Sequence, residues 1–348
     1  MTISVAEIET RWLGDDAVDI GVEALVDSFN RAELLLGRDW LEQPLSSGAT
    51  GSAVALPLHV VGERLRTIEQ AHRRQKLIAR VRNRDEAALS ELHAIALCAA
   101  ADGIEIEIEP EIIVDRRNRI PDFRLRRRNE TWVHVEVTAP TLSESGQAAA
   151  NAATWLASSV ESIPDGVTVQ VRFRDEPTHK DLAEVLEQVP GTCVGQTVDR
   201  PRFVMFVAQA SPSFTPAGSD ERGRPIMGAI RGRLHGDQRA GLLVRVPFTD
   251  ERGQRILDSE AKQLPKEGPG LVCILTNYTN YWSGLIERSF SSTVRRRISG
   301  VLLFHSGIVP GDRGARLPTI GRLFRNPHAR VPLPSWLIGT LEGLRREF

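Results

Sequence analysis

Residues 120–139, IPDFRLRRRNETWVHVEVTA, contain two alternating runs separated by a short polar segment. Asp122 and Glu136 are equally far from Asn129 in the sequence. A β-hairpin with a short loop at residues 128–130 therefore places these two carboxylates opposite each other. Asn tolerates the left-handed backbone conformation that a three-residue loop requires, so this stretch predicts a hairpin centred on Asn129.

The alternation of side chains supports this register. Because successive side chains point to opposite faces of a strand, one face is apolar and carries Phe123, Leu125, Val133, Val135 and Val137. The other face carries Asp122, Arg124, Arg126, Trp132, His134, Glu136 and Thr138. Carboxylates with Cβ atoms roughly 4.5–5.5 Å apart repel each other, and a divalent cation or a shared proton offsets that repulsion. An edge hairpin with a solvated polar face is the structural alternative.

Composition predicts a folded protein without a global affinity for nucleic acid. The chain has 348 residues, of which 41% are hydrophobic and 26% charged, enough for one large domain or two ordinary ones. Its net charge is −1, so any nucleic-acid binding must come from a local patch. The three cysteines match no zinc spacing, and we expect them to be reduced. No targeting segment or membrane span is evident, which predicts a cytoplasmic protein.

The first 83 residues form an α-rich segment in this interpretation. Apolar residues at helical spacing predict a helix over 22–36, and a basic helical region follows at 57–82. Asn83 and Glu86 fit a capping box at the start of a further helix. Glu91 lies on or beside the apolar stripe of that helix, so its carboxylate needs a partner or access to water.

Residues 84–174 predict a core in the order helix, three strands, helix, strand. The first strand spans 104–114, the hairpin supplies two more, and a helix at 143–160 precedes a strand at 167–173. Residues 175–348 predict an α/β region with buried strands, helices near 251–264 and 281–296, and a long loop at 209–238. Whether this region forms a second domain or extends one sheet stays open.

The order of these motifs resembles the PD-(D/E)XK nuclease superfamily. The resemblance covers residues 84–173 and is carried by Glu91 on its helix, by Pro121-Asp122, and by Glu136-Val137-Thr138 on the next strand. It implies an α/β protein with a restriction-endonuclease-like mixed β-sheet core flanked by helices. An α-rich N-terminal segment would precede this core, and an α/β extension would follow it.

The resemblance also implies a metal site and a substrate. In that superfamily, residues at the positions of Asp122 and Glu136 hold a divalent metal, here Mg²⁺ or Mn²⁺. Glu91 would be an auxiliary carboxylate ligand, and the backbone carbonyl of Val137 would be a further ligand. The implied activity is metal-dependent hydrolysis of phosphodiesters in DNA or RNA.

The sequence departs from the superfamily pattern at Thr138, which stands where the signature has lysine. Thr138 cannot supply the positive charge, whereas Arg124, Arg126 or His134 on the same hairpin face could. Arginine stays protonated and cannot act as a general base, but histidine titrates near neutral pH when unperturbed. The candidate catalytic residues are therefore Asp122, Glu136, Thr138 and His134, and Arg124 and Arg126 are candidate nucleic-acid contacts.

Three functions follow from these observations. The first is a metal-dependent nuclease, and the second is a catalytically inactive nuclease-fold module that binds nucleic acid or protein. The third is an α/β scaffold protein without a metal site, whose carboxylate pair is protonated or solvated. Metal binding separates the third function from the first two, and cleavage separates the first from the second.

Overall fold

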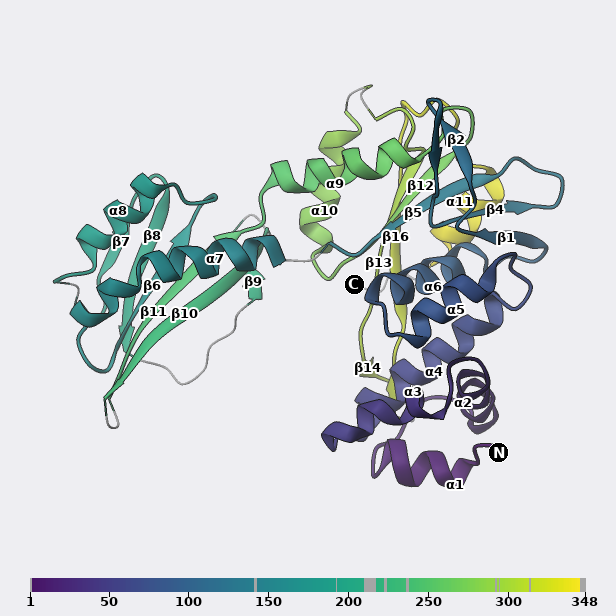
Figure 1. Ribbon diagram of the computed structural model, residues 1–348, viewed down its shortest axis with the longest axis horizontal. Helices are drawn as coiled ribbons and strands as arrows, with labels where there is room; N and C mark the ends of the chain where they lie inside the picture. Colours follow the sequence, from purple (N-terminus) through teal and green to yellow (C-terminus); the bar gives the residue numbers. More distant parts are fainter. Residues whose placement is uncertain are drawn as a thin grey trace. The chain divides into compact units, whose positions relative to one another are not determined.

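The chain folds into two compact units (Figure 1). The computed structural model describes residues 2–140, 143–191, 193–209, 217–221, 224–235, 238–291, 293, 295–312 and 314–344. Unit 1 comprises Met1–Pro140, Leu257–Thr279 and Ile286–Phe348, and unit 2 comprises Thr141–Ile256 and Asn280–Leu285. Unit 2 therefore interrupts unit 1 along the sequence. Together they form an α/β protein with an N-terminal helical segment and two mixed six-stranded sheets.

The sheet of unit 1 combines the predicted hairpin with strands from the end of the chain. Its strand order is β1 (Ile104–Ile108), β4 (Phe123–Arg127), β5 (Val133–Thr138), β12 (Gly270–Leu275), β13 (Gly300–Ser306) and β16 (Thr319–Arg325). Strands β5, β12 and β13 are parallel, and the other neighbouring pairs are antiparallel. The almost wholly apolar runs of β12 and β13 are buried, as expected for central parallel strands.

The N-terminal segment is helical, as predicted. Its α-helices are α1 (Val5–Ile8), α2 (Val22–Leu36), α3 (Arg38–Glu42), α4 (Ser52–Thr67), α5 (Arg74–Arg82) and α6 (Glu86–Cys98), with a π-helix at Glu9–Leu13 and a 3-10 helix at Gln43–Ser47. The expected helical region 57–82 is divided between α4 and α5. The cap of α6 is Asp85 rather than Asn83, because the Asp85 carboxylate accepts hydrogen bonds from the Ala87 and Ala88 amides.

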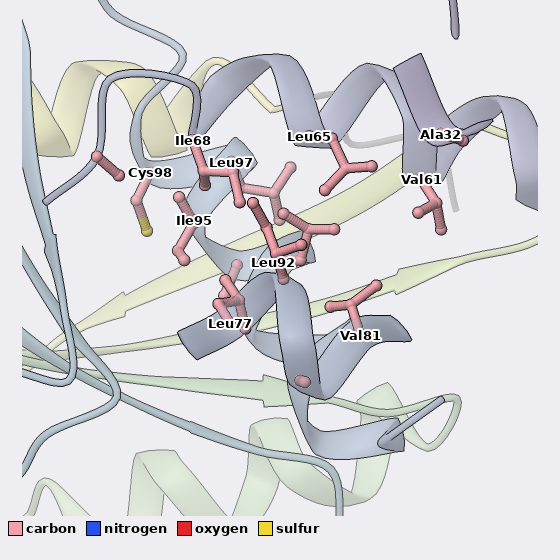
Figure 2. Close-up of a cluster of buried hydrophobic side chains, with 14 of the residues drawn as sticks. Ala32, Val61, Leu65, Ile68, Leu77, Val81, Leu92, Ile95, Leu97 and Cys98 are labelled. Carbon is pink, nitrogen blue, oxygen red and sulfur yellow. The ribbon is translucent and has the colours of Figure 1, made fainter. Parts of the chain in front are cut away.

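These helices share a core with one face of the sheet. Figure 2 shows side chains from α4, α5 and α6 meeting in this core, among them Leu65, Leu77, Val81, Leu92 and Ile95. The same cluster includes Phe123, Leu125, Val133, Val135, Leu271 and Cys273 from the strands. The apolar hairpin face predicted from the sequence is therefore the face that packs against the helices.

The expected strand at 104–114 is two strands in two different sheets. β1 ends at Ile108, and Glu109 adopts a left-handed φ of 45°, which a continuing strand cannot accommodate. Contacts from α5 and the residue preceding it hold this turn, since Arg73 donates to the Glu109 carbonyl at 3.0 Å and Lys76 pairs with its carboxylate at 3.0 Å. Beyond the turn, β2 (Ile112–Val114) pairs with β3 (Arg117–Arg119) as a separate two-stranded sheet.

Unit 2 has its own sheet and core. Its strand order is β7 (Thr197–Asp199), β8 (Phe203–Gln209), β6 (Val167–Phe173), β11 (Gln238–Pro247), β10 (Pro225–His235) and β9 (Ala217–Ser219). The helix α7 (Ser143–Trp155) lies across β10 and β11 (Figure 1), and η3 (Ala157–Ser162) and α8 (His179–Gln188) complete the unit.

Two expectations for this region are wrong. β6 has the predicted bounds but lies in the sheet of unit 2, not beside the hairpin of unit 1. Residues 209–238, expected to be a long loop, contain β9 and β10. The main-chain hydrogen bonds of β10 with β11 outweigh the weak strand preference of its glycine and arginine residues.

The remaining elements belong to the second half of the chain. They are α9 (Asp250–Gln263), α10 (Thr279–Ser289), α11 (Ser335–Glu342) and a short pair of strands, β14 (Val309–Pro310) and β15 (Ala315–Arg316). In the part of the chain that the structure describes, no helix has the length and apolar character needed to cross a membrane.

The close crossing of α2 and α4 generates a stability prediction. A Cβ atom on Gly62 would lie 2.1 Å from the Ser28 carbonyl oxygen, so Gly62→Ala must push the two helices apart. We expect it to lower the free energy of unfolding by about 1–3 kcal/mol or more. Gly339→Ala in α11 is the control, because its Cβ meets open space and should stabilise the helix by about 0.5–1 kcal/mol. Urea unfolding checks both variants, and an unchanged midpoint for Gly62→Ala contradicts the close packing.

Candidate functional site

The hairpin of β4 and β5 has the register predicted from the sequence. Phe123 pairs with Val135, Arg124 with His134 and Leu125 with Val133. Continued by one residue, this register places Asp122 opposite Glu136. Asn129 is left-handed as predicted, with φ 65°, but the connection spans residues 128–132 and is longer than the expected three residues. A hydrogen bond from the Glu130 amide to the Arg127 carbonyl closes the turn.

Asp122 lies just outside β4, at the edge of the ladder. Its Oδ2 accepts a hydrogen bond of 2.6 Å from the amide of Val137 on β5. Burial raises the pKa of Asp122 to about 6, although this amide hydrogen bond and the charge of Arg80 act in the opposite direction. Val137 thus contacts Asp122 through the backbone amide of Val137.

Glu91 on α6 is paired with Arg80, as expected for a carboxylate on an apolar helix face. Its two carboxylate oxygens accept hydrogen bonds from the guanidinium of Arg80 on α5 at 2.8 and 3.0 Å. Burial raises the pKa of Glu91 to about 7, and repulsion from Asp122 adds to the shift, whereas Arg80 opposes it. Arg80 also donates to Asp85, so a single arginine holds the end of α5 against the start of α6.

Glu136 has the most strongly raised pKa among the carboxyl groups of this site. It is only 5% exposed, and its Oε1 is buried without a hydrogen-bond partner among the described residues. Burial raises its pKa to about 10, with further contributions from the charges of Asp122, Glu260 and Glu91. A carboxyl group in such surroundings binds a proton or a cation at neutral pH.

Glu260 on α9 is a fourth member that the sequence interpretation missed. Burial raises its pKa to about 7, and repulsion from Asp122 contributes. The available signal was periodicity, because the fully buried Leu257 lies three residues before Glu260 on the same face of the helix. We call Glu91, Asp122, Glu136 and Glu260 the carboxyl cluster. The charge of Asp122 raises the pKa of all three glutamates. Asp122 is therefore the centre of the carboxyl cluster.

The carboxyl cluster is made of oxygen donors, which suit Mg²⁺ or Mn²⁺ rather than a thiolate-binding metal. The orphaned Oε1 of Glu136 also fits a cation. Across the described ranges, however, no three acidic, histidine or cysteine side chains are already arranged to hold a metal ion. Glu91, for example, is engaged by Arg80. Metal binding by this cluster therefore requires side-chain rearrangement.

The other predicted site residues have different surroundings. Arg124 pairs with Glu107, and Arg126 pairs with Glu105 at 2.7 Å, so the acidic side chains of β1 neutralise both arginines. Their guanidinium groups also stack on the ring of Trp132, at 4.5 and 4.4 Å from its centroid. The positive charge that reaches the carboxyl cluster therefore comes from Arg80.

His134 and Thr138 flank Glu136 along β5. Burial, together with the charge of Arg124, lowers the pKa of His134 to about 4. This value lies below the neutral range in which an unperturbed histidine titrates, so His134 is neutral at neutral pH. Thr138 is half-buried at the end of β5, opposite Ile274 of β12.

No protein-family model, curated protein or solved structure matches this chain.

The raised pKa values predict how stability depends on pH. A carboxyl group whose pKa is raised by folding stabilises the protein below its unfolded pKa, and this contribution is lost as pH rises through the folded pKa. For Glu136 the window runs from about pH 4.5 to about pH 10. Glu136→Gln keeps the neutral form, so we expect it to be more stable than wild type by at least about 1 kcal/mol at pH 8, with little difference at pH 4.5.

Thermal unfolding in EDTA between pH 4.5 and 9 measures this difference. Glu130→Gln, in the exposed loop of the same hairpin, is the matched control and should follow the wild type throughout. A difference between Glu136→Gln and wild type that does not grow with pH would contradict the buried, protonated state of Glu136.

Proposed function

We propose that unit 1 is a metal-dependent nuclease of the PD-(D/E)XK type with a restriction-endonuclease-like core. The element order α6, β1, β4, β5, α9, β12 supports this proposal. In it, β5 and β12 are parallel neighbours, and α9 lies between them in the sequence. The helix and strand that follow the hairpin in this core are therefore α9 and β12. They take the place that was predicted from the sequence for residues 143–173. Residues 141–256 are then an insertion into the nuclease core.

The carboxyl cluster is the observation that carries the proposal. Mg²⁺ or Mn²⁺ would be held by Asp122 and Glu136, with Glu91 and the Val137 carbonyl as the further ligands implied by the resemblance. A bound divalent cation polarises a phosphodiester and lowers the pKa of a bound water molecule. Glu260 would complete the acidic surroundings from α9.

Arg80 supports the proposal at the point where the sequence departs from the superfamily. Thr138 provides no positive charge, but Arg80 contributes a permanent one beside Glu91 and near Asp122. A guanidinium group can contact phosphate oxygens and stabilise the negative charge that develops on them. It cannot remove a proton from water, so Arg80 would be an electrostatic group rather than a general base.

A second function is favoured by two specific observations. Thr138 replaces the signature lysine, and the described carboxylates are not prearranged as a metal site. Both observations favour a non-catalytic nuclease-fold module that binds nucleic acid. In that case the carboxyl cluster holds protons instead of a cation.

Cleavage of mixed substrates tests the proposal. We expect single-stranded DNA, duplex DNA or RNA to be cleaved with Mg²⁺ or Mn²⁺ and not with EDTA. Asp122→Asn should reduce the rate at least about a hundredfold because it removes a charge at the centre of the cluster. Glu130→Gln is the control and should cleave like the wild type.

Thr138→Lys separates the two functions in the same assay. If the wild type is active and Thr138→Lys is no faster, Arg80 suffices as the cation and the nuclease proposal holds. If only Thr138→Lys cleaves, and Asp122→Asn abolishes that gain, the natural protein is the non-catalytic form of the fold. An absence of metal-dependent cleavage in both proteins, over all three substrates, contradicts the nuclease proposal.

A further inference from the structure

A basic cavity of about 660 Å³ lies in unit 1, and no member of the carboxyl cluster lines it. Its walls come from the β2–β3 hairpin, from α9 and from residues 295–297. Two aspartates line it together with five basic side chains, Arg117, Arg119, Lys262, Arg295 and Arg297. Positive charge is therefore in excess in a cavity large enough for a small-molecule ligand.

Both aspartates of the cavity are already paired. Asp115 pairs with Lys266 and Arg297, and the hydrogen bonds from these two side chains lower the pKa of Asp115 to about 2. Asp258 on α9 pairs with Arg295 at 2.9 Å. The acidic groups are thus matched by Lys266, Arg295 and Arg297.

Three basic side chains remain without an acidic partner. Arg117, Arg119 and Lys262 form no ion pair with any residue that the structure describes. The two arginines are on β3 of the hairpin and the lysine is on α9, so they approach the cavity from different elements. These three side chains line a shared space whose two aspartates are paired with other basic residues.

Two buried N–H donors of the cavity walls also lack acceptors. Arg295 is 9% exposed, and its Nε is buried with no hydrogen-bond partner among the described residues. The Nε of Arg119 has the same property. Buried donors in native proteins are nearly always satisfied, so these two donors indicate an acceptor that the described residues do not provide.

We propose that this cavity binds phosphate groups. Phosphate carries several acceptor oxygens and a negative charge, and a guanidinium fork binds it with two parallel hydrogen bonds. The described lining residues include no aromatic side chain, which gives a nucleobase nothing to stack on among them and favours recognition of the phosphate itself. The phosphate source is a small polyphosphate or the backbone of a nucleic-acid strand.

This proposal is independent of metal-dependent cleavage. No member of the carboxyl cluster lines the cavity, and binding to arginine and lysine needs no divalent cation. Both sites nevertheless share α9, which carries Glu260 of the carboxyl cluster as well as Lys262 of the cavity. Because the two sites share no residue, loss of phosphate binding and loss of metal-dependent cleavage can be measured separately.

Calorimetric titration of the full chain with pyrophosphate in EDTA tests the cavity. We expect one saturable site on the wild type and at least about tenfold weaker binding by Arg117→Gln/Arg119→Gln. The matched control, Arg127→Gln/Arg128→Gln, removes the same charge from the exposed end of the β4–β5 hairpin and should bind within twofold of wild type. Circular dichroism establishes that both variants are folded.

Anisotropy of a fluorescein-labelled oligonucleotide, also in EDTA, identifies the phosphate source. If the cavity serves a nucleic-acid strand, Arg117→Gln/Arg119→Gln weakens oligonucleotide binding and pyrophosphate displaces the oligonucleotide. If it serves a small polyphosphate, only pyrophosphate binding depends on these arginines. Absence of saturable binding of both ligands, or equal weakening in the cavity variant and the control, overturns the proposal.

Discussion

The enforced proximity of buried and half-buried carboxyl groups around Asp122 is the constraint on which the candidate site depends. Carboxylates removed from water are unstable as anions, and like charges increase that instability. Arg80 offsets part of this cost at Glu91, but Glu136 has an oxygen with no partner in the described part of the protein. The cluster must therefore hold protons or a cation, and this choice decides between the functions considered for unit 1.

The fold of unit 1 creates this constraint by bringing together the β4–β5 hairpin and two helices that are distant from it in the sequence. Asp122 precedes β4, Glu136 lies on β5, Glu91 lies on α6, and Glu260 lies on α9 beyond the whole of unit 2. By alternation along β5, Val135 faces the core shared with α6, and Glu136 faces away from it. Asp122 lies at the edge of the ladder, and its charge raises the pKa values of Glu91, Glu136 and Glu260.

Local patterns in the sequence predicted the parts of this site that depend on neighbouring residues. The register of β4 and β5 follows from strict alternation and from an asparagine that accepts a left-handed conformation. The bounds of α2 and β6 follow from equally clear periodicity. The need for a partner at Glu91 was also evident, because a carboxylate on an apolar stripe is costly without one.

The parts that were not predicted depend on contacts between distant segments. Pro110 marks the end of the strand because it has no amide hydrogen for a ladder, but the left-handed conformation of Glu109 is held by Arg73 and Lys76 from the region of α5. Arg80 was recognised only as one residue of a basic helix, and its pairing with Glu91 required the packing of α5 on α6. Glu260 was missed because residues 141–256 separate it from the hairpin that it approaches.

The most direct test of the account is proton release on metal binding. Calorimetric titration with Mn²⁺ at pH 6.5, in two buffers of different ionisation enthalpy, gives the number of protons displaced per ion. Carboxyl groups with pKa values of about 6, 7 and 10 should release about one proton or more when Mn²⁺ binds, and Asp122→Asn should abolish the binding. Mn²⁺ binding without proton release, or binding that is unchanged in Asp122→Asn, would contradict a buried carboxyl cluster that exchanges protons for a cation.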